Sequence, residues 1–230
     1  YFVLLSLGYL ALNLIALWVM RGQIQSARTE LMPASYASFL PPISVLVPAY
    51  NEEATISGSI HSLLQLTYPE YEVIVVNDGS KDLTMQVLKE QFQLVPSSAT
   101  CPLHLACQPI LGIYQSSRYP NLKVIDKQNG GKADALNAGI NLSRFPLFCG
   151  VDADSILQRD SLQRIIRPFL DDPYAIAAGG TVRIANGCEV KDGLLLKAAL
   201  PEKLLPQLQI IEYLRGFLFG RLGWSPDRKS

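Results

Sequence analysis

From residue 43 onward, continuously apolar runs alternate with runs of helical periodicity, and this alternation constrains the fold of the 230-residue chain more than any other feature. The stretches 43-ISVLVP-48 and 71-YEVIVVN-77 are short, apolar and rich in β-branched residues. Between them, in 53-EATISGSIHSLLQL-66, apolar residues recur at helical spacing. Strands that are apolar throughout are buried on both faces, as in a parallel sheet covered by helices. The pattern therefore predicts an α/β fold with a mostly parallel sheet.

The same alternation continues toward the C-terminus. It predicts a helix around 83–92, a strand at 122–126, a helix at 133–142, a strand at 146–151 and a helix at 162–170. Residues 93–120 are rich in Ser, Pro and Cys and break the rhythm, so we expect them to form a surface insertion. A single domain over residues 43–200 accounts for the whole pattern.

The first segment, 1-YFVLLSLGYLALNLIALWVM-20, contains no charged residue. As a helix it would span roughly 30 Å, the thickness of the hydrocarbon core of a bilayer. We expect a transmembrane helix, with a buried core helix or a signal peptide as alternatives. Arg21 and Arg28 follow it, so the positive-inside rule predicts a location at the cell membrane with the rest of the chain in the cytoplasm. Residues 21–42 would be a linker.

Charge and cysteine content exclude several classes of partner. Lysine plus arginine (20) equals aspartate plus glutamate (20), so no global charge favours nucleic acid. Cys101, Cys107, Cys149 and Cys188 are irregularly spaced, which is typical of free thiols rather than of a disulfide framework. Cys101, His104 and Cys107 match no common zinc pattern and have no fourth ligand nearby.

Polar, acidic and glycine residues gather where four of the predicted strands end, at 48–52, 77–79, 126–132 and 152–154. In a parallel sheet, ligands bind beyond the carboxyl ends of the strands, so this convergence predicts a binding site. Each segment also has a structural interpretation. Residues 77–79 fit a hairpin turn, Tyr50 a core aromatic, and Glu52 a carboxylate that stabilises a helix N-terminus.

The stretch 149-CGVDADS-155 carries the most specific chemical signal. On extended backbone, residues two apart point the same way, so Asp152 and Asp154 would present two carboxylates to one point. A hard divalent cation, Mg²⁺ or Mn²⁺, would relieve the repulsion between the two carboxylates. Water and phosphate oxygens would complete the coordination of the cation. The alternative is that Asp154 or Ser155 caps the following helix, which explains one acidic residue but not the pair.

The stretch 127-KQNGGKADALNAG-139 places two glycines and Lys132 before a run of good helix formers. It does not match a Walker A loop, because the required first glycine falls on Asp126 and Ala133 replaces the Ser or Thr. A glycine pair, free N–H groups at a helix N-terminus and one cation suit a diphosphate partly neutralised by a metal. A nucleotide diphosphate leaving group of this kind belongs to a glycosyl donor.

Four motifs, in this order after a hydrophobic segment, carry a resemblance to a known family: VPAYNEE (47–53), VVNDGSKD (75–82), NGGKADALNAG (129–139) and VDADS (151–155). The chain resembles family 2 glycosyltransferases, which have the GT-A fold, and among them membrane polysaccharide synthases of the poly-N-acetylglucosamine, hyaluronan and cellulose type. The resemblance covers about residues 1 to 224. It implies an inverting hexosyltransferase that uses a UDP-sugar donor, a divalent metal and a glycan or lipid-linked acceptor.

The resemblance also implies roles for individual residues. Ala49 and Tyr50 would flank the uracil, Asp78 would bond its edge, and Glu52 would support the nucleotide pocket together with Pro48. Asn129 and Gly130 would line the loop whose Lys132 meets the diphosphate. Asp152 would contact the ribose or the metal, and Asp154 the metal.

The departures from the family pattern concern the acceptor side. The family's Thr/Gly-Glu-Asp segment, which supplies the general base, and its Gln-x-x-Arg-Trp motif are both missing from this sequence. We therefore expect a C-terminally truncated form, with low or absent turnover because a general base is worth about 10²–10⁴-fold. The amphipathic segment in 201–230 would lie on the membrane or pack on the sheet. A nucleotide-sugar-binding module without catalysis is the alternative function. A sugar nucleotidyltransferase is less favoured, because such enzymes have a glycine-rich loop after the first strand and 48-PAYNEE-53 contains none.

Overall fold

The computed structural model of the chain describes residues 3, 6–11, 14–15, 40–180, 184–191, 194–197 and 199–216. The chain divides into two compact units. One unit comprises Ala37–Ala178 and Val190–Leu195, and it contains every predicted site residue. The other unit comprises Tyr1–Tyr36, Gly179–Glu189 and Leu196–Ser230.

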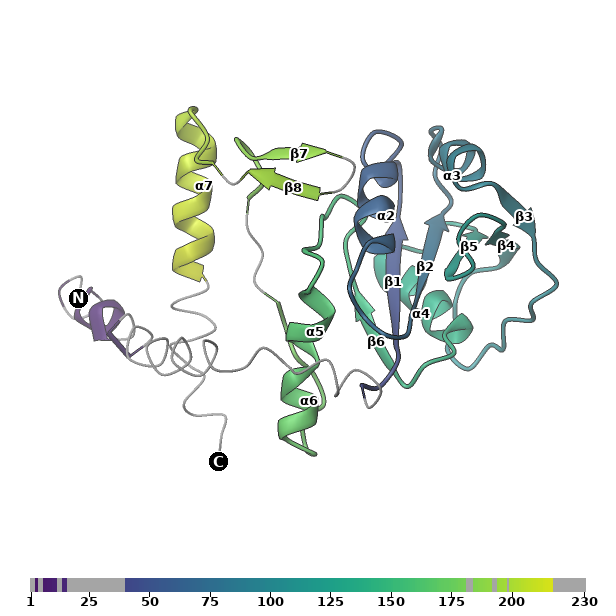
Figure 1. Cartoon of the computed structure of the whole chain (residues 1–230), viewed down its shortest axis with the longest axis horizontal. Coiled ribbons are helices and arrows are strands. Elements are labelled where there is room, and N and C mark those ends of the chain that lie inside the picture. The colour runs from purple at the N-terminus through teal and green to yellow at the C-terminus, as the bar shows by residue number, and fades with distance from the viewer. Residues whose placement is uncertain are drawn as a thin grey trace. The chain divides into compact units, whose positions relative to one another are not determined.

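A six-stranded mixed sheet forms the centre of the first unit (Figure 1). Its order is β3-β4-β5-β2-β1-β6, with β1 at Ile43–Ala49, β2 at Tyr71–Asp78, β3 at Leu94–Pro96, β4 at Ile110–Ser116, β5 at Leu122–Lys127 and β6 at Leu147–Gly150. β1, β2, β5 and β6 are parallel to one another, whereas β4 is antiparallel to both of its neighbours. The parallel sheet predicted from the apolar runs is confirmed for these four strands.

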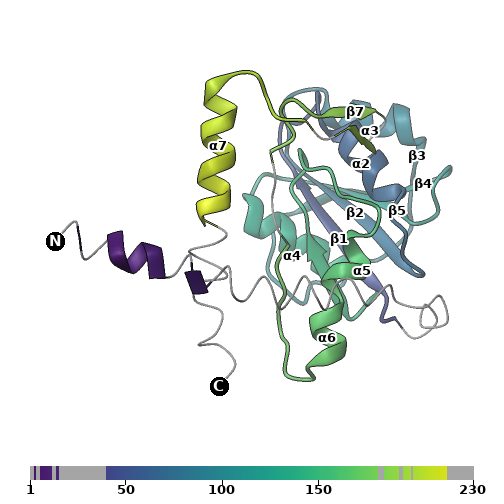
Figure 2. The ribbon, with the colours of Figure 1, turned by 60° about the vertical axis from the view of Figure 1, so that its left-hand side comes forward.

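Helices cover both faces of this sheet (Figure 2). The helices α2 (Ile56–Leu64), α3 (Thr84–Phe92) and α5 (Ser161–Ile165) bury apolar side chains against one face. The helix α4 (Lys132–Leu142) packs on the other face, and a short helix α6 (Arg167–Asp171) follows α5. Val45 faces the first core and Leu46 the second, which is why β1 carries apolar residues on both faces, with Ser44 as the one polar exception.

Residues 93–120 are more than the surface insertion that their composition predicts, because they supply β3 and β4 at one edge of the sheet. Two features hide these strands in the sequence. β3 is only three residues long, and β4 is largely half-buried, with a register shift between Ile110 and Gly112. An edge strand needs no continuous apolar run, so the pattern of the central strands is missing. Residues 97–109 contain no helix or strand.

The remaining described elements are a two-stranded sheet of β7 (Glu189–Lys191) and β8 (Leu194–Lys197), and the helix α7 (Leu204–Arg215). None of the residues of α7 is buried, and Leu204, Leu208 and Ile211 are exposed at helical spacing. In the described part of the chain, no helix is both long and apolar enough to cross a bilayer. Much of the predicted span at 1–20, most of the linker at 21–42 and residues 217–230 lie outside the described residues.

Candidate functional site

The loops that follow β1 and β2 are bonded to each other at the carboxyl edge of the sheet. Because β1 and β2 are parallel with Ala49 opposite Asn77, both loops leave the sheet at the same level. The Asn51 N–H donates to Ser80 Oγ over 3.0 Å, and the Lys81 N–H donates to Asn51 Oδ1 over 2.8 Å. Asn51 has a φ of 56°, a left-handed conformation that Asn tolerates better than most residues.

A second pair of reciprocal bonds joins these two loops. The Glu53 N–H donates to Asp82 Oδ2 over 3.1 Å, and the Leu83 N–H donates to Glu53 Oε2 over 2.9 Å. Asp82 Oδ1 also accepts the N–H and hydroxyl of Thr84 at the start of α3. Desolvation opposes ionisation, but these hydrogen bonds outweigh it and lower the pKa of Asp82. The first two motifs therefore form one rigid unit, a role for Asn51, Glu53 and Asp82 that the sequence did not predict.

The residues of VPAYNEE divide between the core and the surface. Ala49 is 1% exposed and belongs to the first core, so only its main chain is available to a ligand. Pro48 and Glu52 are half-buried, whereas Tyr50 is 45% exposed. The Glu52 carboxylate accepts the Thr55 hydroxyl, and its carbonyl accepts the Thr55 and Ile56 N–H groups. Glu52 therefore contributes to the turn that leads into α2, in agreement with its structural interpretation.

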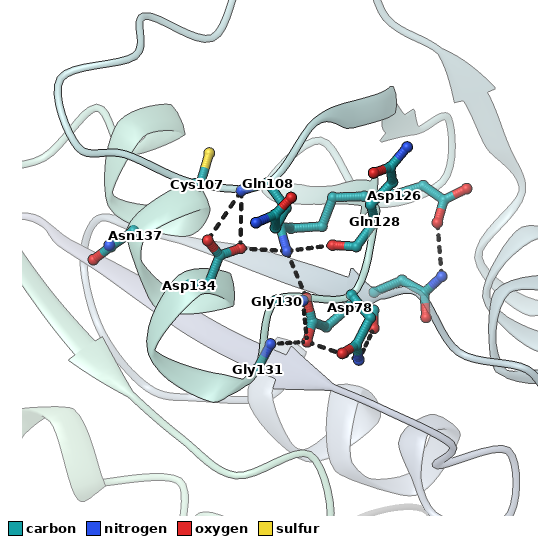
Figure 3. Close-up of polar contacts among 12 residues, drawn as sticks. Asp78, Cys107, Gln108, Asp126, Gln128, Gly130, Gly131, Asp134 and Asn137 are labelled. Atoms are coloured by element: carbon teal, nitrogen blue, oxygen red, sulfur yellow. Dashed lines mark hydrogen bonds and ion pairs between the residues drawn. The ribbon is translucent and has the colours of Figure 1, made fainter.

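Asp78 anchors the glycine-rich loop that precedes α4 (Figure 3). Its side chain is almost completely buried, and its carboxylate accepts the Gly130 N–H at 3.0 Å and the Gly131 N–H at 2.7 Å. Asn129 Nδ2 donates to the Asp78 carbonyl over 2.8 Å. A Cβ at Gly79 would lie 2.7 Å from the Asn129 N, so only glycine permits this approach.

The free N–H groups expected at this helix N-terminus are not those of the glycine pair. The Gly130 and Gly131 groups are already bonded to Asp78, because Gly131 has a φ of +89° and directs the chain back over the end of β2. No acceptor for the N–H of Lys132 or Ala133 is found within the described part of the chain. The first turn of α4 therefore keeps the unbonded donors of a helix N-terminus.

Lys127 lies beneath this loop and is fully buried, at 0% exposure. Its ammonium group bonds Asp78 Oδ1 at 2.5 Å, Asp134 Oδ1 at 2.5 Å and the Gln128 carbonyl at 2.6 Å. Burial alone would lower the pKa of Lys127, but the two carboxylates raise it above its usual value. Lys127 also lowers the pKa of Asp134, against the opposing effect of desolvation.

Lys132 and Asp152 meet at the surface of the same edge. Lys132 is the first residue of α4, Asp152 follows β6, and their side chains form an ion pair. Both side chains are more than half exposed, at 64% and 56%. Lys132 after the glycine-rich loop and Asp152 of the carboxylate pair are therefore adjacent in the structure. An exposed pair of this kind is weak, so either partner can exchange for a ligand of opposite charge at little cost.

Asp152 and Asp154 are both exposed, whereas Ala153 between them and Val151 before them are buried. The backbone is a turn rather than the extended segment expected, because the Ser155 N–H donates to the Asp152 carbonyl over 3.0 Å. Within the described residues, Asp154 has no hydrogen bond or ion pair, and no group of three His, Cys, Asp or Glu side chains suits a metal ion. Two exposed carboxylates nevertheless fit Mg²⁺ or Mn²⁺, which accept few protein ligands and keep water or phosphate oxygens.

The four cysteines lie within the described part of the chain, and all of them are free thiols. Cys101 and Cys107 pack against the second core beside α4, and the described residues hold no metal-binding group with His104.

A mixed sheet flanked by helices, with acidic residues and a lysine at the carboxyl edge of its parallel strands, fits the GT-A class of glycosyltransferase domain. The family model "Glycosyl transferase family 2" matches residues 44–192, and the chain belongs to this family. The domain is therefore a glycosyltransferase domain, as its four motifs predict.

Curated relatives agree with this assignment. The chain is 30% identical over 172 residues to the poly-beta-1,6-N-acetyl-D-glucosamine synthase of Staphylococcus epidermidis, covering 74% of this chain. It is 29% identical over 175 residues to the synthase of the same name from Staphylococcus aureus strain COL, covering 76% of this chain. The aligned part corresponds to 32% and 33% of these relatives, so the chain spans about a third of their length.

Among solved structures, the chain is similar to S. aureus TarS 1-349 in complex with UDP-GlcNAc, with 27% identity and a TM-score of 0.41. The aligned part covers 56% of this chain and 31% of that one.

Proposed function

We propose that this domain binds a UDP-sugar at the carboxyl edge of its parallel strands and transfers the sugar to an acceptor hydroxyl. The observation that carries the proposal is the ion pair between Lys132 and Asp152, which unites two motifs from distant parts of the sequence. Each partner is exposed and held by a rigid neighbour: the glycine-rich loop on one side and the end of β6 on the other.

The uridine would lie over the joined loops after β1 and β2. Tyr50 offers an exposed ring for stacking, and Asp78 lies at the end of the adjacent strand. The Asp78 carboxylate already accepts several donors, so a bond to the uracil edge would be shared with the loop amides. Pro48 and the main chain of Ala49 would form the floor, and Glu52 would hold the loop in place.

The diphosphate would then lie between Lys132 and the two aspartates. The Lys132 ammonium and the unbonded N–H groups of the first turn of α4 direct positive charge to this place. Asn129 and Gly130 line the loop beside it. Asp152 and Asp154 would hold Mg²⁺ or Mn²⁺, which when bound supplies charge neutralisation of the departing UDP. Preorganised positive charge of this kind lowers the barrier to leaving-group departure.

N-acetylglucosamine is the sugar that the relatives favour, since the synthases that align with this chain are named for its polymer. The acceptor would be a glycan or a lipid-linked saccharide. The uncharged segment at 1–20 supports a membrane anchor with the catalytic domain on the cytoplasmic side.

Substitution of Asp154 tests the metal site and the donor site together. Asp154→Asn removes one carboxylate at an exposed position, so the fold should persist while Mn²⁺-dependent UDP binding falls by about tenfold or more. Isothermal titration of UDP with and without Mn²⁺ measures this. Asp160→Asn is the matched control, because among the described residues the side chain of Asp160 pairs only with Arg164, one turn further along the chain. Equal UDP affinity in Asp154→Asn and wild type would contradict the proposed site.

Catalysis is tested separately from binding. Incubation with UDP-N-acetylglucosamine should release UDP slowly if the domain is a transferase, because water can replace the acceptor. Binding without any UDP release would favour the binding module.

A further inference from the structure

The role of Lys127 goes beyond the proposed donor contacts, because it is buried and cannot touch a ligand at the surface. Each of its three ammonium hydrogens has an acceptor, on Asp78, Asp134 and Gln128. Burying a charged lysine is costly unless such partners compensate, and removing one partner of a buried pair is strongly destabilising. The geometry of the three acceptors is therefore tightly set by Lys127.

Two of these acceptors each hold a different loop. Asp78 binds the N–H groups of Gly130 and Gly131. Asp134, in the first turn of α4, accepts the Gln108 N–H at 3.0 and 3.1 Å. Lys127 thus joins the glycine-rich loop to the end of the 97–109 segment through two carboxylates (Figure 3).

The space between these groups is closely filled. A Cβ added at Gly130 would lie 2.5 Å from Asp134 Cγ and 2.8 Å from Gln108 Cγ. The glycine-rich loop is therefore confined between Asp78 on one side and Asp134 with Gln108 on the other. Loss of the charge that holds both carboxylates would release the loop, and Lys132 directly follows it.

We propose that Lys127 is a positioning residue of the donor site: through Asp78 it holds the 129–131 loop and so sets where Lys132 meets the diphosphate. The predicted effect of Lys127 on UDP binding rests on the proposed function. The predicted effect of Lys127 on the 129–131 loop does not depend on it. Register supports the assignment, since Asp78 and Lys127 are direct cross-strand neighbours at the ends of β2 and β5.

Lys123 provides a matched control on the same strand. It lies four residues before Lys127 on β5, and its ammonium group also pairs with a buried β2 carboxylate, that of Glu72, at 2.9 Å. Glu72 lies at the opposite end of β2, away from the glycine-rich loop. Lys123→Met and Lys127→Met therefore each remove one lysine charge that pairs with a buried carboxylate of β2. Only the charge of Lys127 is joined, through Asp78, to the glycine-rich loop.

Amide hydrogen exchange of the full chain, followed by NMR, tests the loop directly. In Lys127→Met the exchange of the Gly130 and Gly131 amides should rise by about tenfold or more relative to wild type, because Asp78 loses its counter-ion and turns toward water. In Lys123→Met both amides should remain as protected as in wild type. Equal protection in Lys127→Met and wild type would overturn the proposal. If Lys127→Met does not fold, Asp78→Asn breaks the same contact without a change of size, and unchanged exchange there has the same meaning.

Affinity for UDP and for uridine, in the presence of Mn²⁺, separates this role from general destabilisation. Lys127→Met should weaken UDP binding by about tenfold more than uridine binding, because both ligands would lose the Asp78 contact to uracil but only UDP carries the diphosphate that Lys132 would meet. Equal losses for both ligands, or no loss for either, would overturn the positioning role. Absence of UDP binding in wild type would instead reject the proposed function, and the exchange result would still decide whether Lys127 holds the loop.

Discussion

At the residue scale, this domain uses its carboxylates in two different ways. Glu72 and Asp78 are buried at opposite ends of β2, and each is compensated by a lysine of β5. Asp152 and Asp154 are exposed at the end of β6 and form at most one surface ion pair within the described part of the chain. The buried carboxylates stabilise the fold, whereas the exposed ones keep the capacity to bind a cation.

Glu72 predicts how stability changes with pH. Desolvation raises its pKa, but hydrogen bonds from the Arg144 N–H, Lys123 and Ser44 outweigh this, so the pKa lies below the ordinary value of 4.5. A depressed pKa contributes stability that is complete above the unfolded value and is lost as pH falls through the folded value. Glu72→Gln should lose about 2 kcal/mol of unfolding free energy at pH 7. The difference from wild type should shrink as pH falls below about 4.5.

Urea denaturation at pH values from neutral to acidic measures this effect. Glu70→Gln is the control, because Glu70 is exposed and contributes only its carbonyl to a described hydrogen bond. A difference between Glu72→Gln and wild type that stays constant over the whole pH range would show that ionisation of Glu72 does not contribute.

At the scale of elements, α4 connects the carboxyl edge of the parallel strands with the 97–109 segment. Asp134, Asn137 and Asn141 lie on one face of the helix, at spacings of three and four. Asn141 accepts the Leu105 N–H at 2.9 Å and donates to the Leu105 carbonyl at 2.8 Å, and Asn137 donates to the Ala106 carbonyl. The segment predicted as an insertion is thus held against the helix that begins with Lys132.

Loss of Asn141 should release this segment. Asn141→Ala leaves the Leu105 main chain without its two bonds, at a cost of about 1–3 kcal/mol, so Cys107 beside it should react faster with a thiol reagent. Mass spectrometry of alkylated peptides gives the rate at each cysteine. Cys149 on β6, whose pKa is raised by burial, is the internal control and should keep its wild-type rate. Equal acceleration at both cysteines would indicate global unfolding instead.

At the scale of the whole molecule, four motifs separated in sequence meet along one edge of one sheet. Adjacent parallel strands bring VPAYNEE beside VVNDGSKD, β5 brings the glycine-rich loop beside Asp78, and β6 brings Asp152 to Lys132. A ligand that spans all four would bind only the folded state and would stabilise the molecule as a unit.

Thermal unfolding with UDP tests this at the whole-molecule scale. UDP with Mn²⁺ should raise Tm, with a stabilisation of about 2.7 kcal/mol at a free concentration of 100 times Kd. Chelation by EDTA should remove most of the shift, because the diphosphate would lose the cation held by Asp152 and Asp154. A shift that is the same with and without Mn²⁺ would contradict the metal-dependent part of the proposal.

Much of the fold could be predicted from local pattern. The runs 43–48 and 71–77 are mostly apolar because both faces of their strands are covered, so their burial is visible in the sequence itself. β3 and β4 could not be predicted, because β3 is an edge strand of three residues and β4, which β3 pairs with only near its end, is largely half-buried and carries mixed residues. The roles of Asp78 and Lys127 were also out of reach, because their pairing depends on the register of two strands about 50 residues apart.

The sequence by itself determined the α/β class, the family and the order of the four motifs, because periodicity and motif spacing are local properties of the chain. Tertiary structure alone decided which polar groups are already bonded to one another and which remain exposed. The Gly130 and Gly131 amides belong to Asp78, whereas Lys132, Asp152 and Asp154 lie open at the surface. This division follows from strand register and burial, which arise only when distant segments pack together.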